Sequence, residues 1–143
     1  MVLRDHCSLS LCGSSAIYLV TADVSAAFAF WVAGTLIDLD HLNDYWRDDG
    51  FNLNLRRFFG YFSRRGPRYL LLAFHGWEWP LCLLALAWGA SEPLWLWCFA
   101  AGWLSHLILD QRFNRRQKSL GYFFAFRWSR GFKASEFYDG SSP

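Results

Sequence analysis

The chain has 143 residues, of which 54% are hydrophobic and 20% aromatic, including nine Trp. This apolar fraction is more than a domain of this length usually buries, so the composition predicts a protein that lies in a bilayer. The net charge is only +2, and no run of Lys and Arg is interleaved with aromatic residues, which excludes nucleic acid as a partner. No linker rich in Pro, Gly or Ser divides the sequence, so we expect residues 1–143 to form a single membrane domain.

The first forty residues predict two short membrane helices, at 6–20 and 24–38. Each segment has about 15 residues, whereas a standard span needs about 20. The break falls at Asp23, which is a good N-cap for the second segment and would be costly inside a bilayer. We therefore favour a helical hairpin over the alternative of one tilted helix.

Residues 51–64 predict an amphipathic helix in the membrane interface. Leu55, Phe58, Phe59 and Phe62 recur at spacings of three and four, so they share one helix face. Arginines surround this face, as in helices that place an aromatic side in acyl chains and hold lipid phosphates with Arg. The alternative is a helix that packs against a partner protein.

Two longer apolar segments, 69–88 and 94–113, each have about the 20 residues that a transmembrane helix needs. Pro80 is expected to kink the first of them, because it removes a backbone donor. The fold class that follows is an all-α integral membrane protein. It combines a short N-terminal helical hairpin with two transmembrane helices and an interfacial amphipathic helix.

The positive charges predict the orientation of these segments. The fourteen Lys and Arg fall in three places, namely Arg4, the loop from Arg47 to Arg68, and the stretch from Arg112 to Lys133. By the positive-inside rule this loop and the tail 119–143 are cytoplasmic. The hairpin then places both termini in the cytoplasm.

Ionisable residues inside membrane helices are costly and indicate function. This chain has three groups of them, which are Asp38–Asp40–His41, His75–Glu78 and His106–Asp110. Spacings of three and four place both members of a pair on one helix face, where they can contact one ion. With the predicted topology the three groups lie at a similar depth near the cytoplasmic side, and His6 joins them where it begins the first helix.

The residue types in these groups predict a metal site. The apolar segments contain no Lys or Arg apart from Arg112 near the end of the last one, so one or two divalent cations are the simplest compensation for the carboxylates. Mixed His and carboxylate ligands fit Zn²⁺ best, with Mn²⁺ and Fe²⁺ as alternatives. The predicted metal ligands are His6, Asp38, Asp40, His41, His75, Glu78, His106 and Asp110. A hydrogen-bonded core or a proton relay without metal stays open.

Three motifs, GTLIDLDH, FHGWE and AGWLSHLILDQ, resemble those of the bacterial inner-membrane metal-dependent hydrolases, which are distantly related to zinc-dependent phospholipase C. The family's Asp-x-Asp-His and Gly-x-x-x-His-x-x-x-Asp patterns match Asp38, Asp40, His41, His106 and Asp110, and His6 matches its early His more loosely. In place of the His-Arg-Gly-x-Thr-His-Ser run of many members, this chain has His75-Gly76-Trp77-Glu78. The resemblance implies a metal-dependent hydrolase of the bacterial inner membrane.

Together these observations predict a membrane-embedded hydrolase of a phosphoester at the cytoplasmic face, with a phospholipid or a polyprenyl phosphate as substrate. The proton of the attacking water would pass to Glu78 or Asp40. The alternative is a non-catalytic subunit of a larger membrane complex, in which the metal staples four short helices. Expected partners are membrane lipid, a lipid-phosphate substrate, and other membrane proteins or further copies of the chain.

Overall fold

The computed structural model describes residues 3–64, 67–90, 93–114 and 117–138, and every named element within these ranges is a helix. Seven are α-helices, which are α1 (Leu3–Thr21), α2 (Val24–Leu36), α3 (Asp40–Asp49), α4 (Leu55–Arg64), α5 (Glu78–Ala90), α6 (Leu94–Phe113) and α7 (Phe124–Ser129). Three are 3₁₀-helices, which are η1 (Ile37–Leu39), η2 (Ser119–Tyr122) and η3 (Ala134–Glu136).

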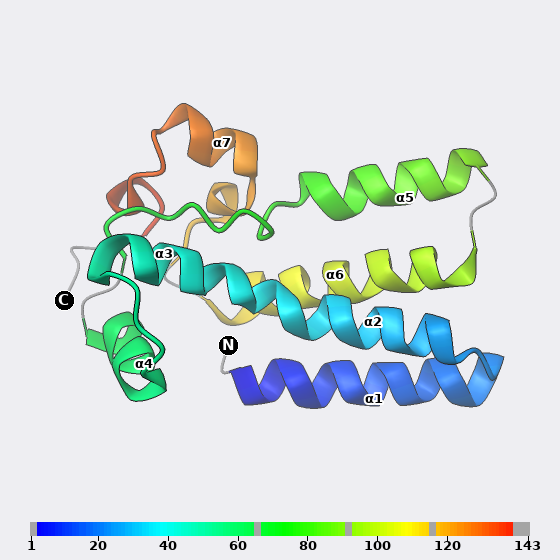
Figure 1. Ribbon diagram of the computed structural model, residues 1–143. Helices are drawn as coiled ribbons and strands as arrows, with labels where there is room; N and C mark the ends of the chain where they lie inside the picture. The colour runs from blue at the N-terminus through cyan, green and yellow to red at the C-terminus, as the bar shows by residue number, and fades with distance from the viewer. Residues whose placement is uncertain (1–2, 65–66, 91–92, 115–116, 139–143) are drawn as a thin grey trace.

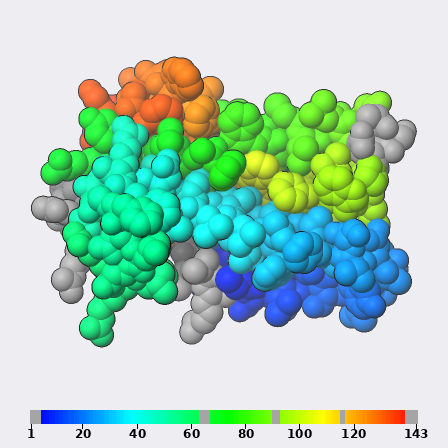
Figure 2. All heavy atoms as spheres, viewed as in Figure 1, coloured from blue at the N-terminus to red at the C-terminus, as the bar shows by residue number. Residues whose placement is uncertain are grey.

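Four of the helices form a bundle in which α2 packs between α1 and α6, and α5 packs on α6 (Figure 1). The N-cap predicted at Asp23 is present, since its carboxylate accepts a hydrogen bond from the backbone N–H of Ala26 at 3.0 Å. At the other end of α2 the chain continues through η1 into α3, and α4 and α7 gather around that end (Figure 1). The side chains of α3 and α4 form one continuous block there (Figure 2).

Small residues allow the three central helices to approach closely. On α2 the buried residues include Ala26, Ala27, Ala29, Ala33 and Gly34. On α6, a Cβ added at Gly102 would lie 2.4 Å from the backbone oxygen of Phe30, so only glycine permits this crossing of α2 and α6. The close approach brings the second half of α6 beside the end of α2, where the polar residues of both segments meet.

Residues 67–77 are not helical, although the sequence predicts a transmembrane helix that begins at residue 69. The backbone of this loop is held by side chains from distant elements. Both carboxylate oxygens of Asp44 accept hydrogen bonds from the N–H groups of Leu71 and Leu72. The guanidinium of Arg127 donates to the carbonyls of Leu72 and His75. These bonds hold Leu72 in the left-handed region, with φ of 37°, a strained conformation for a leucine.

The C-terminal segment packs on this loop rather than extending away as a tail. Leu70 and Leu72 of the loop form a buried apolar cluster with Ala134 and Phe137. The backbone N–H of Leu70 also donates to the carbonyl of Phe132. The part of the predicted tail at 139–143 lies outside the described residues.

The predicted integral membrane fold is wrong, because no helix among the described residues combines the length and the apolar character that crossing a bilayer requires. Of the segment 69–88, only the part from Glu78 is helical, so α5 has 13 residues where a span needs about 20. α6 has 20 residues, but His106, Asp110 and Arg112 interrupt its second half. The inner-membrane localisation and the cytoplasmic placement of the termini were inferred from these spans. Both predictions are therefore wrong.

Two local predictions fail for physical reasons that the structure makes plain. Pro80 does not kink a helix, because it lies in the first turn of α5, where its missing N–H has no helical partner to lose. The aromatic face assigned to the membrane interface is partly used inside the protein. Phe58 of α4 packs edge-on against Tyr45 of α3, with ring centroids 5.4 Å apart, and Phe62 packs against His41 at the same distance.

Candidate metal centre

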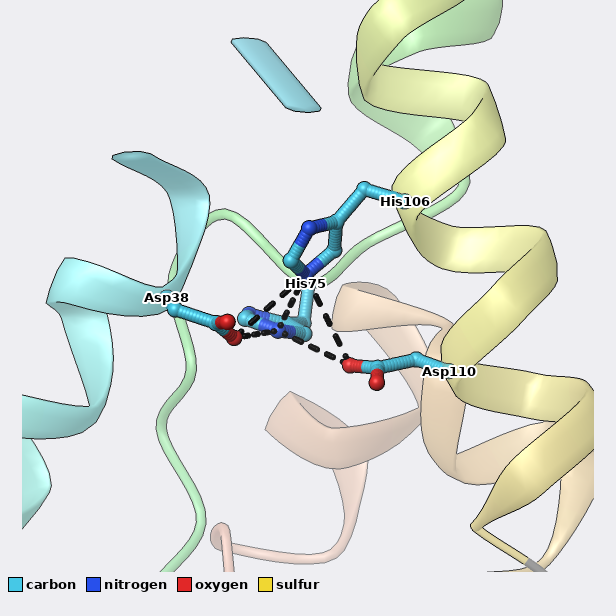
Figure 3. A group of neighbouring side chains, drawn as sticks. All are labelled: Asp38, His75, His106 and Asp110. Carbon is cyan, nitrogen blue, oxygen red and sulfur yellow. Dashed lines mark hydrogen bonds and ion pairs between the residues drawn. The ribbon is translucent and has the colours of Figure 1, made fainter. Parts of the chain in front are cut away.

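Four side chains from three separate segments converge at the end of the bundle (Figure 3). His106 and Asp110 lie one turn apart on the same face of α6, as their spacing of four requires. Asp38 comes from η1, and His75 comes from the loop before α5. His75, His106 and Asp110 are buried, whereas the side chain of Asp38 is 20% exposed and so marks the way to solvent.

Each of the four residues directs one nitrogen or oxygen atom toward a common centre. His75 Nε2 lies 3.5 Å from Asp38 Oδ1 and 3.3 Å from Asp110 Oδ2. His106 Nε2 lies 3.4 Å from Asp38 Oδ1 and 3.6 Å from Asp110 Oδ2. The two Nε2 atoms are 3.4 Å apart. All five separations are longer than the 2.7–3.2 Å typical of a hydrogen bond from nitrogen.

Five of the six separations among these atoms are close to the edges of a tetrahedron of metal ligands. A zinc ion with bonds of about 2.0–2.1 Å in tetrahedral geometry holds its ligand atoms about 3.3–3.4 Å apart. The four atoms therefore have the spacing of a coordination shell. This cluster of His75, His106, Asp38 and Asp110 could hold a metal ion.

Both histidines are oriented for this role by bonds to their other ring nitrogen. His75 Nδ1 lies 3.1 Å from Asp40 Oδ2, and His106 Nδ1 lies 3.0 Å from the carbonyl oxygen of Gly34. A carbonyl accepts only from a protonated nitrogen, which leaves Nε2 of His106 with the lone pair that a metal needs. A carboxylate or carbonyl behind the ligating ring is the usual arrangement in protein metal sites.

The two carboxylates of the cluster carry the negative charge that a cation requires, whereas His75 holds a proton. Burial raises the pKa of Asp38, but the nearby imidazoles of His106 and His75 lower it by more, so the carboxylate is ionised throughout the neutral range. Burial likewise raises the pKa of Asp110, and its hydrogen bonds with His6 and His75 lower it well below the ordinary value. For His75, burial lowers the pKa, but the charge of Asp40 and the hydrogen bond to Asp110 raise it well above 6.5.

Three further predicted ligands lie at the edge of this cluster. His6 is buried on α1, with Nε2 2.9 Å from Asp110 Oδ1 and its ring stacked on that of His106. Asp40 and His41, at the start of α3, form a second group with His75 whose ligand atoms lie within 4.8 Å of one another. The structure thus brings seven of the eight predicted ligands together, as an inner group of four and these three neighbours.

Glu78 lies apart from both groups. Its two oxygens accept hydrogen bonds from the backbone N–H groups of Phe124 and Ala125, at 3.0 and 2.9 Å. The carboxylate therefore holds the start of α7 against the start of α5. The roles predicted for Glu78, metal ligand and proton acceptor, stay predictions without support from its position.

Sequence reasoning missed the residues that support His75. Asp44 and Arg127 are almost fully buried and satisfy the backbone of the loop that carries it. Arg127 was assigned to a cytoplasmic tail, and nothing in its neighbourhood of aromatic residues marks it as buried. One available signal was Pro80, which favours the first turn of a helix and thereby indicates that the residues before it are not helical.

Comparison with known proteins gave no match, whether to a family model, to a curated protein or to a solved structure. The resemblance to the bacterial inner-membrane metal-dependent hydrolases therefore stays an interpretation of three short motifs. The geometry of the cluster does not depend on it.

Proposed function

We propose that the chain is a metal-dependent hydrolase that cleaves a phosphoester. The observation that carries the proposal is that one residue of the buried His and Asp cluster, Asp38, reaches the surface. An ion at such a site can polarise a phosphoryl oxygen and lower the pKa of a water molecule to near neutral. Access through the surface beside Asp38 is what a substrate requires, whereas three buried ligands hold the ion in place.

Zn²⁺ is the metal that we propose. Two imidazoles and two carboxylates at tetrahedral spacing suit Zn²⁺, which is most often four-coordinate in proteins. Mn²⁺ and Fe²⁺ accept the same ligand types but prefer more of them. The proposal of Zn²⁺ thus depends on the spacing and not on the residue types alone.

Of the two carboxylates predicted to be catalytic, Asp40 is the better placed. One of its oxygens accepts from the Phe74 N–H and faces His75 Nδ1, and the other, Oδ1, is buried without a hydrogen-bond partner. Both oxygens of Glu78 are occupied by backbone N–H groups. Asp40 is therefore the carboxylate available to act beside the ion.

The substrate is proposed only as a phosphoester. A phospholipid or polyprenyl phosphate followed from a site just beneath a bilayer surface, and the spans that defined that surface are absent from the described residues. The cluster itself favours no particular leaving group. The partners predicted from the sequence stay predictions.

The second candidate function is a non-catalytic metal staple, and the four-ligand geometry favours it. Structural zinc sites use four protein ligands, whereas catalytic ones use three and leave a position for water. In this role the ion would join η1, the loop of His75 and α6. The two candidates share a binding site but differ in turnover.

The experiment measures bound metal and hydrolysis of bis(p-nitrophenyl) phosphate in the same preparations. We expect zinc and turnover in the wild type, and loss of both in Asp38→Ala and His106→Ala. Asp49→Asn is the control, because Asp49 pairs with Arg57 on the surface away from the cluster. Turnover that survives both substitutions contradicts a hydrolase at this site. Metal without turnover in the wild type supports the staple.

A further inference from the structure

One side of the bundle, formed by α1 and α2, exposes apolar side chains. α1 lies at an edge of the bundle, next to α2 (Figure 1). From Cys7 to Ile37 the sequence has a single charged residue, Asp23, whose carboxylate caps α2. We call this surface the α1–α2 face, and its large exposed apolar residues are Leu11, Tyr18, Leu19, Val24 and Phe28.

The α1–α2 face contains a hollow of about 520 Å³ between the two helices. Besides the five large residues, its lining consists of Ser14, Ser15, Ala27 and Trp31. Ser14 donates its hydroxyl to the carbonyl of Ala27 at 2.7 Å, and Ser15 donates to a carbonyl of its own helix at 2.9 Å. Because both hydroxyls already have acceptors, the hollow favours an occupant with apolar side chains.

The shape of the face is complementary to itself. Leu19 of α1 is 83% exposed and Phe28 of α2 is 61% exposed, so both project from the surface beside the hollow. The space between them is left by the small residues Ser14, Ser15 and Ala27. In a pair related by a two-fold axis the same patch of each copy meets itself. The projecting side chains of each copy can then fill the hollow of the other.

The charges around the face restrict the chemistry of its partner. No Lys or Arg lies between Arg4 and Arg47, so the face has no cation to hold a lipid phosphate or an acidic protein. A charge on a partner would be buried here without a counter-ion, which costs free energy. The partner must therefore present an uncharged apolar surface of its own. A second copy of the α1–α2 face meets this requirement.

We propose that two copies of the chain form a symmetric dimer through the α1–α2 face. By the usual size of such side chains, the five large residues expose on the order of 600 Å², close to the roughly 800 Å² that each partner of a standard complex buries. The smaller lining residues and the adjoining turns of α1 add to this area. The dimer does not depend on the proposed hydrolysis, because the four residues of the metal cluster lie outside the face.

The mass of the assembly in solution tests the proposal. Sedimentation equilibrium is measured for the wild type, Leu19→Glu and Leu86→Glu. Leu86 is the matched control, because it is the same residue type, 67% exposed on α5, and does not line the hollow. We expect a dimer for the wild type and for Leu86→Glu, and a monomer for Leu19→Glu. Circular dichroism spectra equal to that of the wild type show that both variants are folded.

The native cysteines allow a second measurement that places no charge in the contact. Cys7 and Cys12 lie on α1, whereas Cys82 is exposed on α5. A bifunctional maleimide should join two wild-type copies through the thiols of α1, because the dimer brings the two α1 helices together. We expect the cross-linked dimer to persist in Cys82→Ser and to disappear in Cys7→Ser/Cys12→Ser.

Every other outcome overturns a dimer through this face. A monomeric wild type leaves the face to a different protein or to lipid. Assemblies larger than two contradict a symmetric contact, which closes at two copies. A dimer in Leu19→Glu or a monomer in Leu86→Glu places the contact elsewhere on the molecule. The same holds for a cross-link that depends on Cys82, and for a wild-type dimer that the maleimide does not join.

Discussion

His6 Nε2 lies 2.9 Å from Asp110 Oδ1, although 104 positions separate the two residues in the chain. The His6 ring also stacks on His106, with centroids 4.1 Å apart and planes inclined by 21°. His6 therefore supports two inner residues from α1, and the other oxygen of Asp110 is left to face the centre of the cluster. His6 thus contacts two of the candidate ligands from behind and is not itself one of the four residues whose atoms meet at the centre.

Replacing His6 should weaken metal binding without abolishing it. In His6→Phe the stacking on His106 is kept and the bond to Asp110 is lost, so the affinity should fall about 10- to 100-fold, as is typical for residues behind a ligand. His106→Ala should lose the ion. Calorimetric titration with Zn²⁺ measures both. A complete loss in His6→Phe would instead make His6 a ligand, as the sequence predicts.

Metal binding should weaken as the pH falls. Although burial lowers the pKa of His75, the charge of Asp40 raises it by more, so the ring is protonated at neutral pH when no ion is bound. An ion must displace the proton on Nε2, so about one proton should leave for each ion at the inner site. Titration in buffers with different heats of ionisation counts the protons. A binding heat that is the same in every buffer would contradict the assignment.

The stability of the metal-free protein should show the same linkage. The raised pKa of His75 stabilises the fold below pH 6.5, and this contribution is lost as the pH rises through the folded-state pKa. The lowered pKa of Asp38 contributes above 3.8 and is lost as the pH falls. Urea unfolding of the wild type and of His75→Gln across this range measures the histidine contribution. A difference between them that does not shrink with rising pH would contradict it.

Gly102→Ala should separate α6 from α2. The new Cβ would lie 2.4 Å from the backbone oxygen of Phe30, which cannot move aside as a side chain can. We expect a loss of about 1–3 kcal/mol in the free energy of unfolding, together with weaker metal binding because His106 shifts. Gly89→Ala is the matched control, since a Cβ there meets nothing within 4 Å. Equal stability of the two variants would show that α2 and α6 are less tightly packed than described.

Arg127→Lys should destabilise the loop that carries His75. The guanidinium donates to the carbonyls of His75, Gly121 and Leu72, and an ammonium group cannot reproduce this fork. Buried carbonyls left without a donor should lower the free energy of unfolding by at least about 2 kcal/mol. Arg130→Lys, at an exposed position, serves as the control. Unchanged urea unfolding and unchanged metal affinity in Arg127→Lys would show that these hydrogen bonds from Arg127 do not hold the loop of His75.

Glu78→Gln separates a structural role from a catalytic one. Its two acceptor bonds to the start of α7 predict lower thermal stability but turnover within a few-fold of the wild type. Removal of a general base would instead reduce turnover about 100- to 10,000-fold. Thermal unfolding and phosphodiester hydrolysis of the same variant decide between the roles.

Much of the helical pattern could be predicted from local sequence. Asp23 marks the start of α2, and the apolar segment 94–113 coincides with α6, because caps and helix length depend on neighbouring residues. The loop 67–77 could not be predicted in the same way. Its apolar residues suit a helix, but hydrogen bonds from Asp44 and Arg127 hold another conformation, and such contacts leave no local pattern.

The candidate site was predicted by an argument whose premise was wrong. A common depth in a bilayer was expected to align Asp38, His75 and His106, yet the described helices do not span one. The residues meet because small residues bring α2 against α6 and because the loop of His75 folds over the end of both. Spacing within α6 was sufficient to pair His106 with Asp110, whereas the place of His75 depended on the tertiary fold.

The bond from Arg127 to the carbonyl of His75 also orders events during protein synthesis, because it spans 52 positions of the chain. A nascent chain that has released every inner ligand, up to Asp110, still lacks the guanidinium that holds the loop of His75. The cluster of His75, His106, Asp38 and Asp110 can take its final form only after Arg127 has left the ribosome. Until then, one of the four candidate ligands is not yet in place.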